Sequence, residues 1–171
     1  HLFMKDEVIN MDVLIFSGQS NMQGMGDVLT ENREVKNALE YKYLSDTLVP
    51  VKNPCGEDIL YGMKPGYNYT YGINFSKWYE ELVLCAPCYG NTNMIPEFIR
   101  SYLSVSEGKV VAFSATKGAT TSEMWIPGSK GFDALMTKTR AAIKKIGKEN
   151  VGHVSAVWLQ GESDAMADVS A

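Results

Sequence analysis

Short apolar runs, separated by helical segments, constrain the fold of this chain more than any other feature. Residues 13–16, 109–114 and 154–159 are rich in strand-forming side chains. A run that is apolar on both faces is typical of a strand buried in a parallel sheet. Because parallel strands need crossover connections, the alternation of strands with helices predicts a three-layer αβα fold around a parallel sheet.

Helical spacing of apolar side chains marks the segments between these strands. It is clearest over residues 132–146, and it also predicts helices over residues 95–105 and 72–84. Residues 50–72 hold three of the six prolines, which predicts a long surface loop. A short helix is predicted after the turn at residues 17–21, and residues 31–48 should contain little regular structure beyond a strand near residues 41–44.

Composition indicates one globular domain and excludes some classes of partner. The chain has 171 residues, of which 45% are hydrophobic and 21% charged, enough for one sizeable core. We therefore expect residues 1–171 to form a single domain. The net charge of −4 argues against a nucleic-acid partner. No apolar run approaches the roughly 20 residues that span a bilayer, so no membrane partner is expected.

The cysteines suggest neither a disulfide framework nor a metal site. Their number, three, is odd, and Cys85 and Cys88 have the C-x-x-C spacing of some redox sites. A thioredoxin-like pair would begin a helix, whereas this pair follows a helix-like stretch and leads into a loop. Since no second ligand pair accompanies it, we expect no metal and no cofactor.

Three polar loops leave the carboxyl ends of the predicted strands. They cover residues 18–22, 116–121 and 160–164, and each combines glycine with small polar or acidic side chains. Ligands of an open parallel sheet bind at the carboxyl ends of its strands. We therefore expect the three loops to meet at one edge and to supply a nucleophile, hydrogen-bond donors and a carboxylate.

Each prominent side chain in these loops has a functional and a structural interpretation. Ser20 lies on a strand-to-helix turn, where it is either a nucleophile or a helix cap; the G-x-S-x-G elbow is absent. Gly118 either brings a backbone N–H to the substrate or makes a turn with positive φ. Gln160 either donates its amide to an oxyanion or makes a loop hydrogen bond.

The acidic and aromatic residues near these loops are equally open to two interpretations. Glu162 and Asp164 are candidates for a general base, although loop carboxylates are more often solvated or capping. Trp125 could stack on a sugar face or belong to the core.

Together the loops resemble successive blocks of the sialate O-acetylesterase/acetylxylan esterase family, a carbohydrate-esterase branch of the SGNH hydrolases. The blocks are Gly18-Gln19-Ser20-Asn21-Met22-x-Gly24, Lys117-Gly118-x-Thr120-Thr121-x-x-x-Trp125 and Trp158-x-Gln160-Gly161-Glu162-Ser163-Asp164. They occur in the family's order and span nearly the whole chain, which makes the match specific and favours Ser20 as a nucleophile.

The resemblance implies a flavodoxin-like sheet and removal of O-acetyl groups from sialic acid or xylan-type sugars through an acyl-serine intermediate. It implies an oxyanion hole made by the backbone at Ser20 and Gly118 and by the side chain of Gln160. Glu162 would lie near the catalytic base and orient it. Substrate contacts are expected at Gln19, Asn21, Thr120, Trp125 and Asp164. A carbohydrate esterase also favours a secreted or periplasmic location over a cytoplasmic one.

The chain departs from the family pattern in its histidines. The family base is a histidine in a D-x-x-H block near the C-terminus, but only His1 and His153 are present. His153 precedes the strand over residues 154–159, roughly 15 Å or more from the active edge. We therefore expect a domain truncated before that block, weak or inactive, with an uncovered sheet edge that promotes self-association.

Two other functions are compatible with parts of this pattern. A non-catalytic sugar-binding domain could use the same cleft, and the missing histidine favours it. A nucleotide-binding α/β domain is disfavoured because the chain has no G-x-x-x-x-G-K-[ST] motif.

Overall fold

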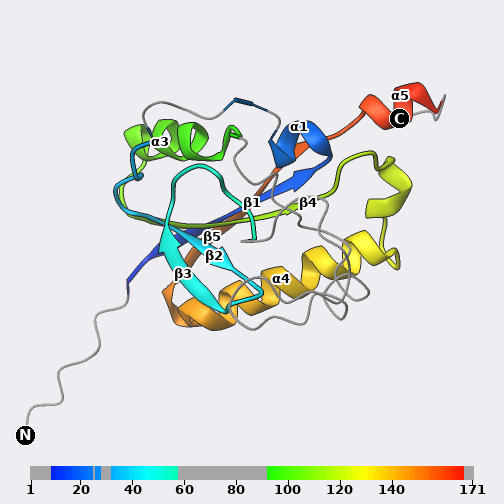
Figure 1. Cartoon of the computed structure of the whole chain (residues 1–171). Helices are drawn as coiled ribbons and strands as arrows, with labels where there is room; N and C mark the ends of the chain where they lie inside the picture. The colour runs from blue at the N-terminus through cyan, green and yellow to red at the C-terminus, as the bar shows by residue number, and fades with distance from the viewer. Residues whose placement is uncertain (1–8, 25, 28–31, 58–91, 168–171) are drawn as a thin grey trace, which may run out of the picture.

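The computed structural model describes residues 9–24, 26–27, 32–57 and 92–167, and a five-stranded sheet lies at its centre (Figure 1). The strand order is β3-β2-β4-β1-β5. The strands are β1 (Met11–Gly18), β2 (Ala38–Lys42), β3 (Thr47–Pro50), β4 (Lys109–Thr116) and β5 (Val151–Leu159). Four of them run parallel, and β3 pairs antiparallel with β2.

Strand β1 lies between β4 and the edge strand β5, and its apolar residues face both layers of helices. Val13 pairs with Val111 of β4 on one side and with Val154 of β5 on the other. The chain leaves β1 toward β2 on one side, whereas the connection from β4 runs in the opposite direction and reaches β5 on the other side of β1. This is the arrangement that opens a crevice at the carboxyl ends of a doubly wound sheet.

Two helices cover opposite faces of the sheet, α3 (Ile95–Val105) and α4 (Lys130–Ile146) (Figure 1). Leu14 and Phe16 pack in one core with Ile99 of α3, whereas Val13 belongs to the second core, on the side of α4. This alternation follows from the period of two along a strand. The predicted three-layer αβα fold is confirmed.

The remaining helices are short and lie near the ends of the strands. They are α1 (Ser20–Gln23), the 3-10 turns η1 (Ser122–Trp125) and η2 (Lys148–Asn150), and α5 (Glu162–Met166). No described helix has the length and apolar character needed to cross a membrane. The predicted helix over residues 72–84, and the pair Cys85 and Cys88, lie outside the described residues.

The predicted strand near residues 41–44 is a β2–β3 hairpin in the structure. Its turn contains Asp46 at φ +50°, and the Asp46 carboxylate accepts a hydrogen bond of 3.0 Å from the Tyr41 hydroxyl. The prediction missed β3 because this turn contains neither glycine nor proline. It also missed the single antiparallel pairing among the described strands, which adds an edge to the parallel sheet.

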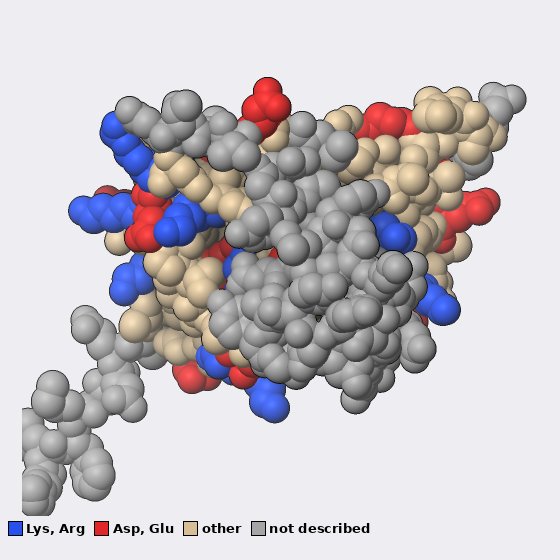
Figure 2. All heavy atoms as spheres, viewed as in Figure 1, with Lys and Arg blue, Asp and Glu red and all other residues tan. Residues whose placement is uncertain are grey.

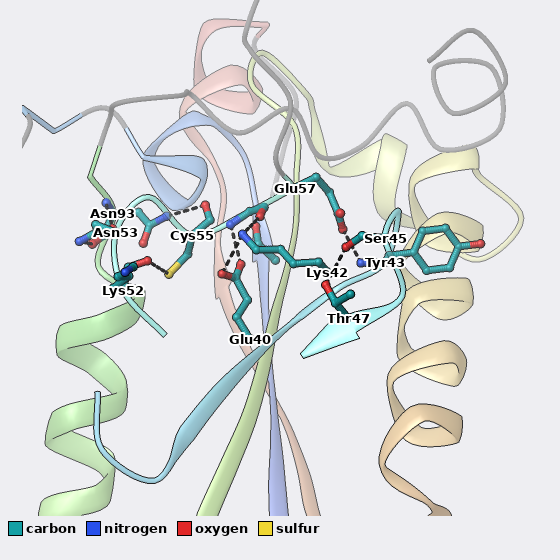
Figure 3. A network of polar contacts seen from close by, with 12 residues as sticks. Glu40, Lys42, Tyr43, Ser45, Thr47, Lys52, Asn53, Cys55, Glu57 and Asn93 are labelled. Atoms are coloured by element: carbon teal, nitrogen blue, oxygen red, sulfur yellow. Dashed lines mark hydrogen bonds and ion pairs between the residues drawn. The ribbon is translucent and has the colours of Figure 1, made fainter. Parts of the chain in front are cut away.

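Buried ions fix the segment that follows β3, residues 51–57. The Lys42 ammonium lies 3.0 Å from Glu40, and the two side chains are 6% and 4% exposed (Figure 3). The other Glu40 oxygen accepts a 2.6 Å hydrogen bond from the Gly56 N–H. Residues 51–57 were predicted as part of a surface loop, but Val51 is fully buried and Glu57 is 2% exposed. That prediction is wrong for this segment.

A second buried ion pair joins the same segment to α4. The Glu57 carboxylate lies 2.9 Å from the Lys138 ammonium, and each side chain is 2% exposed. Lys138 also donates to the Ser114 carbonyl of β4 at 2.6 Å, and Glu57 accepts from the backbone N–H groups of Tyr43 and Leu44. These bonds connect the segment to the helix and to the sheet.

Strand β5 forms the edge of the described sheet, and its side chains are exposed. Val154 and Trp158 have 48% and 47% of their surface accessible, far more than the apolar residues of β1. On the side shown in Figure 2, acidic and basic side chains of the described residues are intermixed around the margin.

Candidate active site

The loops that follow β1 and β5 are held in direct contact. The Gln19 N–H donates to the Leu159 carbonyl at 3.1 Å, and the Ser163 N–H donates to the Gln19 side chain at 3.2 Å. Gly18 has φ +139°, and a β-carbon there would lie 1.9 Å from the Leu159 carbonyl oxygen. Only glycine allows this approach, so Gly18 sets the spacing between the two loops.

Ser20 is the first residue of α1, and its side chain is half-buried. The N-cap is Gln19, without a side-chain capping bond, so the interpretation of Ser20 as the helix cap is wrong. Within the described part of the chain, no hydrogen bond is made by the Ser20 hydroxyl. The hydroxyl is therefore positioned at the turn without a capping role.

Gly118 brings the loop after β4 against Ser20. A β-carbon at Gly118 would lie 3.5 Å from the Ser20 β-carbon, which is van der Waals contact. Its N–H, predicted to face an oxyanion, donates to the Gln23 side-chain oxygen at 3.1 Å. The residue with positive φ in this loop is Ala119, at +57°. Gly118 is thus distinguished by its proximity to Ser20 rather than by an unusual φ.

Thr120 and Trp125 follow Gly118 in the same loop and are hydrogen-bonded to each other. The Thr120 hydroxyl donates to the Lys117 carbonyl at 2.8 Å and accepts from the Trp125 indole N–H at 3.2 Å. Trp125 is only 7% exposed and packs edge-on against Trp158, with ring centroids 5.3 Å apart. The exposed ring is that of Trp158, which sequence reasoning did not name as a site residue. Its position two residues before Gln160 was the available signal.

The Gln160 amide joins the loop after β5 to the loop after β4. Its nitrogen donates to the Thr120 carbonyl at 2.5 Å and to the Asp164 carboxylate at 3.0 Å. The amide oxygen is buried, with no hydrogen-bond partner among the described residues.

Asp164 is 4% exposed, and its carboxylate is surrounded by donors from the protein. One oxygen accepts from the Ser122 N–H and from the Ser122 hydroxyl, both at 2.8 Å, and the other accepts from Gln160. Hydrogen bonds from Gln160 and from the Ser122 backbone hold the pKa of Asp164 below its ordinary value.

Glu162 contacts the turn formed by residues 19–21. One of its carboxylate oxygens accepts a hydrogen bond from the exposed Asn21 amide. The second oxygen is buried and makes no hydrogen bond within the described residues. A donor from outside the described residues would satisfy this oxygen.

His153 lies at the opposite end of β5, bound to Asp12. Its Nδ1 is 3.1 Å from the Asp12 carboxylate, and its side chain is 81% exposed. In the β1–β5 register, Val154 pairs with Val13 whereas Leu159 pairs with Gly18. The strand between these pairs spans roughly 17 Å, so His153 is far from Ser20, as the sequence predicted.

The structure brings the three predicted loops to one edge, with Ser20, Gly118, Gln160 and Glu162 on segments in mutual contact. A family model described as carbohydrate esterase, sialic acid-specific acetylesterase matches residues 10–171. The chain belongs to this family.

Comparison with solved structures supports the αβα fold of this family member. A protein from Arabidopsis thaliana of known X-ray structure aligns with a TM-score of 0.58 and 17% sequence identity. The match covers 91% of this chain and 59% of the plant protein. At this identity the likeness concerns the fold alone. Among curated proteins, none matches the chain.

Proposed function

We propose that this protein is a serine esterase that removes O-acetyl groups from carbohydrates through an acyl-serine intermediate, with Ser20 as the nucleophile. The observation that supports it best is the contact of the Ser20 turn with Gly118 on one side and with the Gln160–Glu162 loop on the other. A nucleophile between backbone N–H groups and a side-chain amide is the arrangement that acyl transfer requires.

In the proposed reaction, the Ser20 oxygen adds to the acetyl carbonyl carbon while a base takes the hydroxyl proton. The oxyanion accepts hydrogen bonds from the backbone N–H of Ser20, and from the Gly118 N–H and the Gln160 amide, whose bonds to Gln23 and Thr120 it shares or displaces. The intermediate then collapses. The bond to the sugar oxygen breaks, and the sugar takes the proton from the base. Water next attacks the acyl-serine, releasing acetate and restoring the Ser20 hydroxyl.

The family resemblance implies a histidine as the base, oriented by Glu162. One Glu162 oxygen is buried and lacks a partner within the described residues, which suits a carboxylate awaiting an N–H donor. Without a base, a serine hydroxyl is a weak nucleophile. We therefore expect the 171-residue chain to be a weak esterase by itself, and a longer polypeptide with an Asp-x-x-His block to be much faster.

Acetate release from acetylated xylo-oligosaccharides and from O-acetylated sialic acid tests this proposal. In a polypeptide containing the Asp-x-x-His block, Ser20→Ala should lower the rate by about 10³-fold or more. Ser104→Ala is the matched control, because Ser104 is an exposed serine on α3. Hydrolysis that persists in Ser20→Ala would contradict the proposal.

A second candidate function is binding of carbohydrate without catalysis. It is favoured by the position of His153, the one described histidine, at the far end of β5. Labelling by a fluorophosphonate separates the two functions, because covalent reaction requires an activated hydroxyl. If acetylated sugars bind but neither labelling nor hydrolysis depends on Ser20, the binding function is the correct one.

A further inference from the structure

Asp164 was expected from the sequence to contact substrate, but its carboxylate faces the protein. It is 4% exposed, and its hydrogen bonds go to Ser122 and Gln160. We propose that Asp164 is a positioning residue, which fixes the orientation of the Gln160 amide and ties the loop after β5 to the loop after β4. The proposal deepens the esterase function above and rests on it for the role of Gln160.

The geometry at Gln160 shows how a carboxylate can determine the direction of an amide. The amide nitrogen lies between two acceptors, the Asp164 carboxylate at 3.0 Å and the Thr120 carbonyl at 2.5 Å. Rotation of the amide by half a turn would place its oxygen against both of them, which is strongly repulsive. One orientation is therefore available, and the N–H groups must point toward the loop after β4.

The second carboxylate oxygen of Asp164 anchors this arrangement. Both the backbone N–H and the hydroxyl of Ser122 donate to it at 2.8 Å, so the carboxylate itself cannot rotate without losing two bonds. Ser122 begins η1, which leads to the buried Trp125. The position of the Gln160 amide is thus set by η1, the turn that follows the Gly118 loop.

This placement matters because an oxyanion donor acts through preorganisation. A donor that is already oriented needs no rearrangement when charge develops on the substrate oxygen. In this structure Asp164 accepts one N–H of Gln160 and the Thr120 carbonyl accepts the other. In the proposed reaction, the oxyanion shares the N–H that donates to Thr120, as a three-centre hydrogen bond. Asp164 therefore affects the reaction only through Gln160, and it touches no reacting atom.

The first experiment reads the Gln160 side-chain amide directly, by NMR of the ¹⁵N-labelled chain, with the signal assigned by its loss in Gln160→Met. In the wild type we expect its N–H protons to exchange with solvent at least about tenfold more slowly than those of an unstructured glutamine. Asp164→Asn should accelerate this exchange and shift the signal, because one acceptor becomes an N–H donor. Asp133→Asn, at an exposed position of α4, is the control and should change neither.

The second experiment is a double-mutant cycle on Ser20-dependent acetate release. Asp164→Asn should lower kcat roughly tenfold with a smaller change in KM. In a Gln160→Ala background the same substitution should change kcat less than about twofold, since its effect passes through Gln160. Equal effects in both backgrounds would overturn the proposal and leave Asp164 a structural residue.

The two experiments separate this proposal from the esterase function. If Asp164→Asn does not fold, the wild-type exchange rate still decides, since Gln160 protons that exchange as fast as those of a free glutamine overturn the placement. If no hydrolysis depends on Ser20, the esterase function fails, whereas slow exchange that Asp164→Asn accelerates still supports the positioning of Gln160 by Asp164.

Discussion

The α-carbon of Gly18 packs so closely against the Leu159 carbonyl that a β-carbon there would lie 1.9 Å from the oxygen. The same carbonyl accepts the Gln19 N–H at 3.1 Å. The last residues of β1 and β5 therefore meet backbone to backbone, immediately before the turn that carries Ser20.

We expect Gly18→Ala to lower the free energy of unfolding by about 3 kcal/mol or more, since it combines an overlap with backbone and a φ of +139°. Gly128→Ala is a matched control, because Gly128 has φ +89° and a β-carbon added there would meet no atom within 4 Å. That control should cost only about 1 kcal/mol, for backbone strain. Urea denaturation measures both, and equal costs would contradict the steric explanation.

Gly118→Ala should separate stability from reactivity. The added β-carbon would lie 3.5 Å from the Ser20 β-carbon, so the fold should lose less than about 1 kcal/mol. The approach of a substrate carbonyl to the Ser20 hydroxyl becomes crowded. In a polypeptide that contains the Asp-x-x-His block, we therefore expect labelling by a fluorophosphonate to slow by about tenfold or more. Ala119→Gly, at the neighbouring position, controls for changes in the loop backbone. Unchanged labelling in Gly118→Ala would place the reacting carbonyl elsewhere.

Glu40 should make stability depend on pH in the direction opposite to most carboxylates. Burial raises the pKa of Glu40 from 4.5 to about 7, although Lys42 and the Gly56 N–H lower it and Glu57 raises it further. Between these two pH values, folded Glu40 retains a proton that the unfolded chain has lost. The contribution of Glu40 to the free energy of unfolding should therefore fall as the pH rises from about 4.5 to about 7.

Glu40→Gln should remove this contribution, because the amide does not titrate. Denaturation at a series of pH values measures the slope, with Glu107→Gln as the exposed control. Other carboxylates act in the opposite direction, so the test is the difference between the variant and the wild type. A difference that is constant over this pH range would show that Glu40 stays ionised in the folded state.

The exposed edge of β5 should promote self-association of the 171-residue chain. Val154 is 48% exposed on a strand, Val151–Leu159, that has no proline, lysine, arginine or acidic residue to prevent pairing. Sedimentation should show dimers or larger species that Val154→Lys weakens by roughly tenfold. Val105→Lys, at a valine that is 87% exposed on α3, should have little effect. A wild-type chain that stays monomeric at high concentration would refute this prediction.

The parallel core could be predicted from sequence because burial on both faces leaves an unambiguous apolar run. The run at residues 13–16 became the centre of β1, and α4 was recognised from its one apolar face. Its true start at Lys130 depends on the Ser129 hydroxyl, which accepts the Phe132 N–H at 3.2 Å. The meeting of the three loops followed from strand direction alone.

The burial of β2 and of residues 51–57 could not be predicted in full, because several of the buried side chains are charged. Glu40, Lys42 and Glu57 suggest an exposed segment to any reasoning based on hydropathy, and only their ion pairs and hydrogen bonds make burial tolerable. The orientation of the Gln160 amide could not be predicted from the sequence either. It depends on Asp164, four residues away, and on Thr120 from another loop.

The ion pair between Glu57 and Lys138 also restricts how this sequence can change over evolutionary time. With each side chain 2% exposed, neutralising one partner would leave a full charge in a medium that solvates it poorly, a cost of about 3–5 kcal/mol. Replacing both residues by apolar ones could leave the free energy of unfolding nearly unchanged. That change needs two substitutions, however, and the protein with only the first of them would be unstable. These positions, 81 residues apart in the sequence, are therefore expected to vary together or not at all among descendants of a common ancestor.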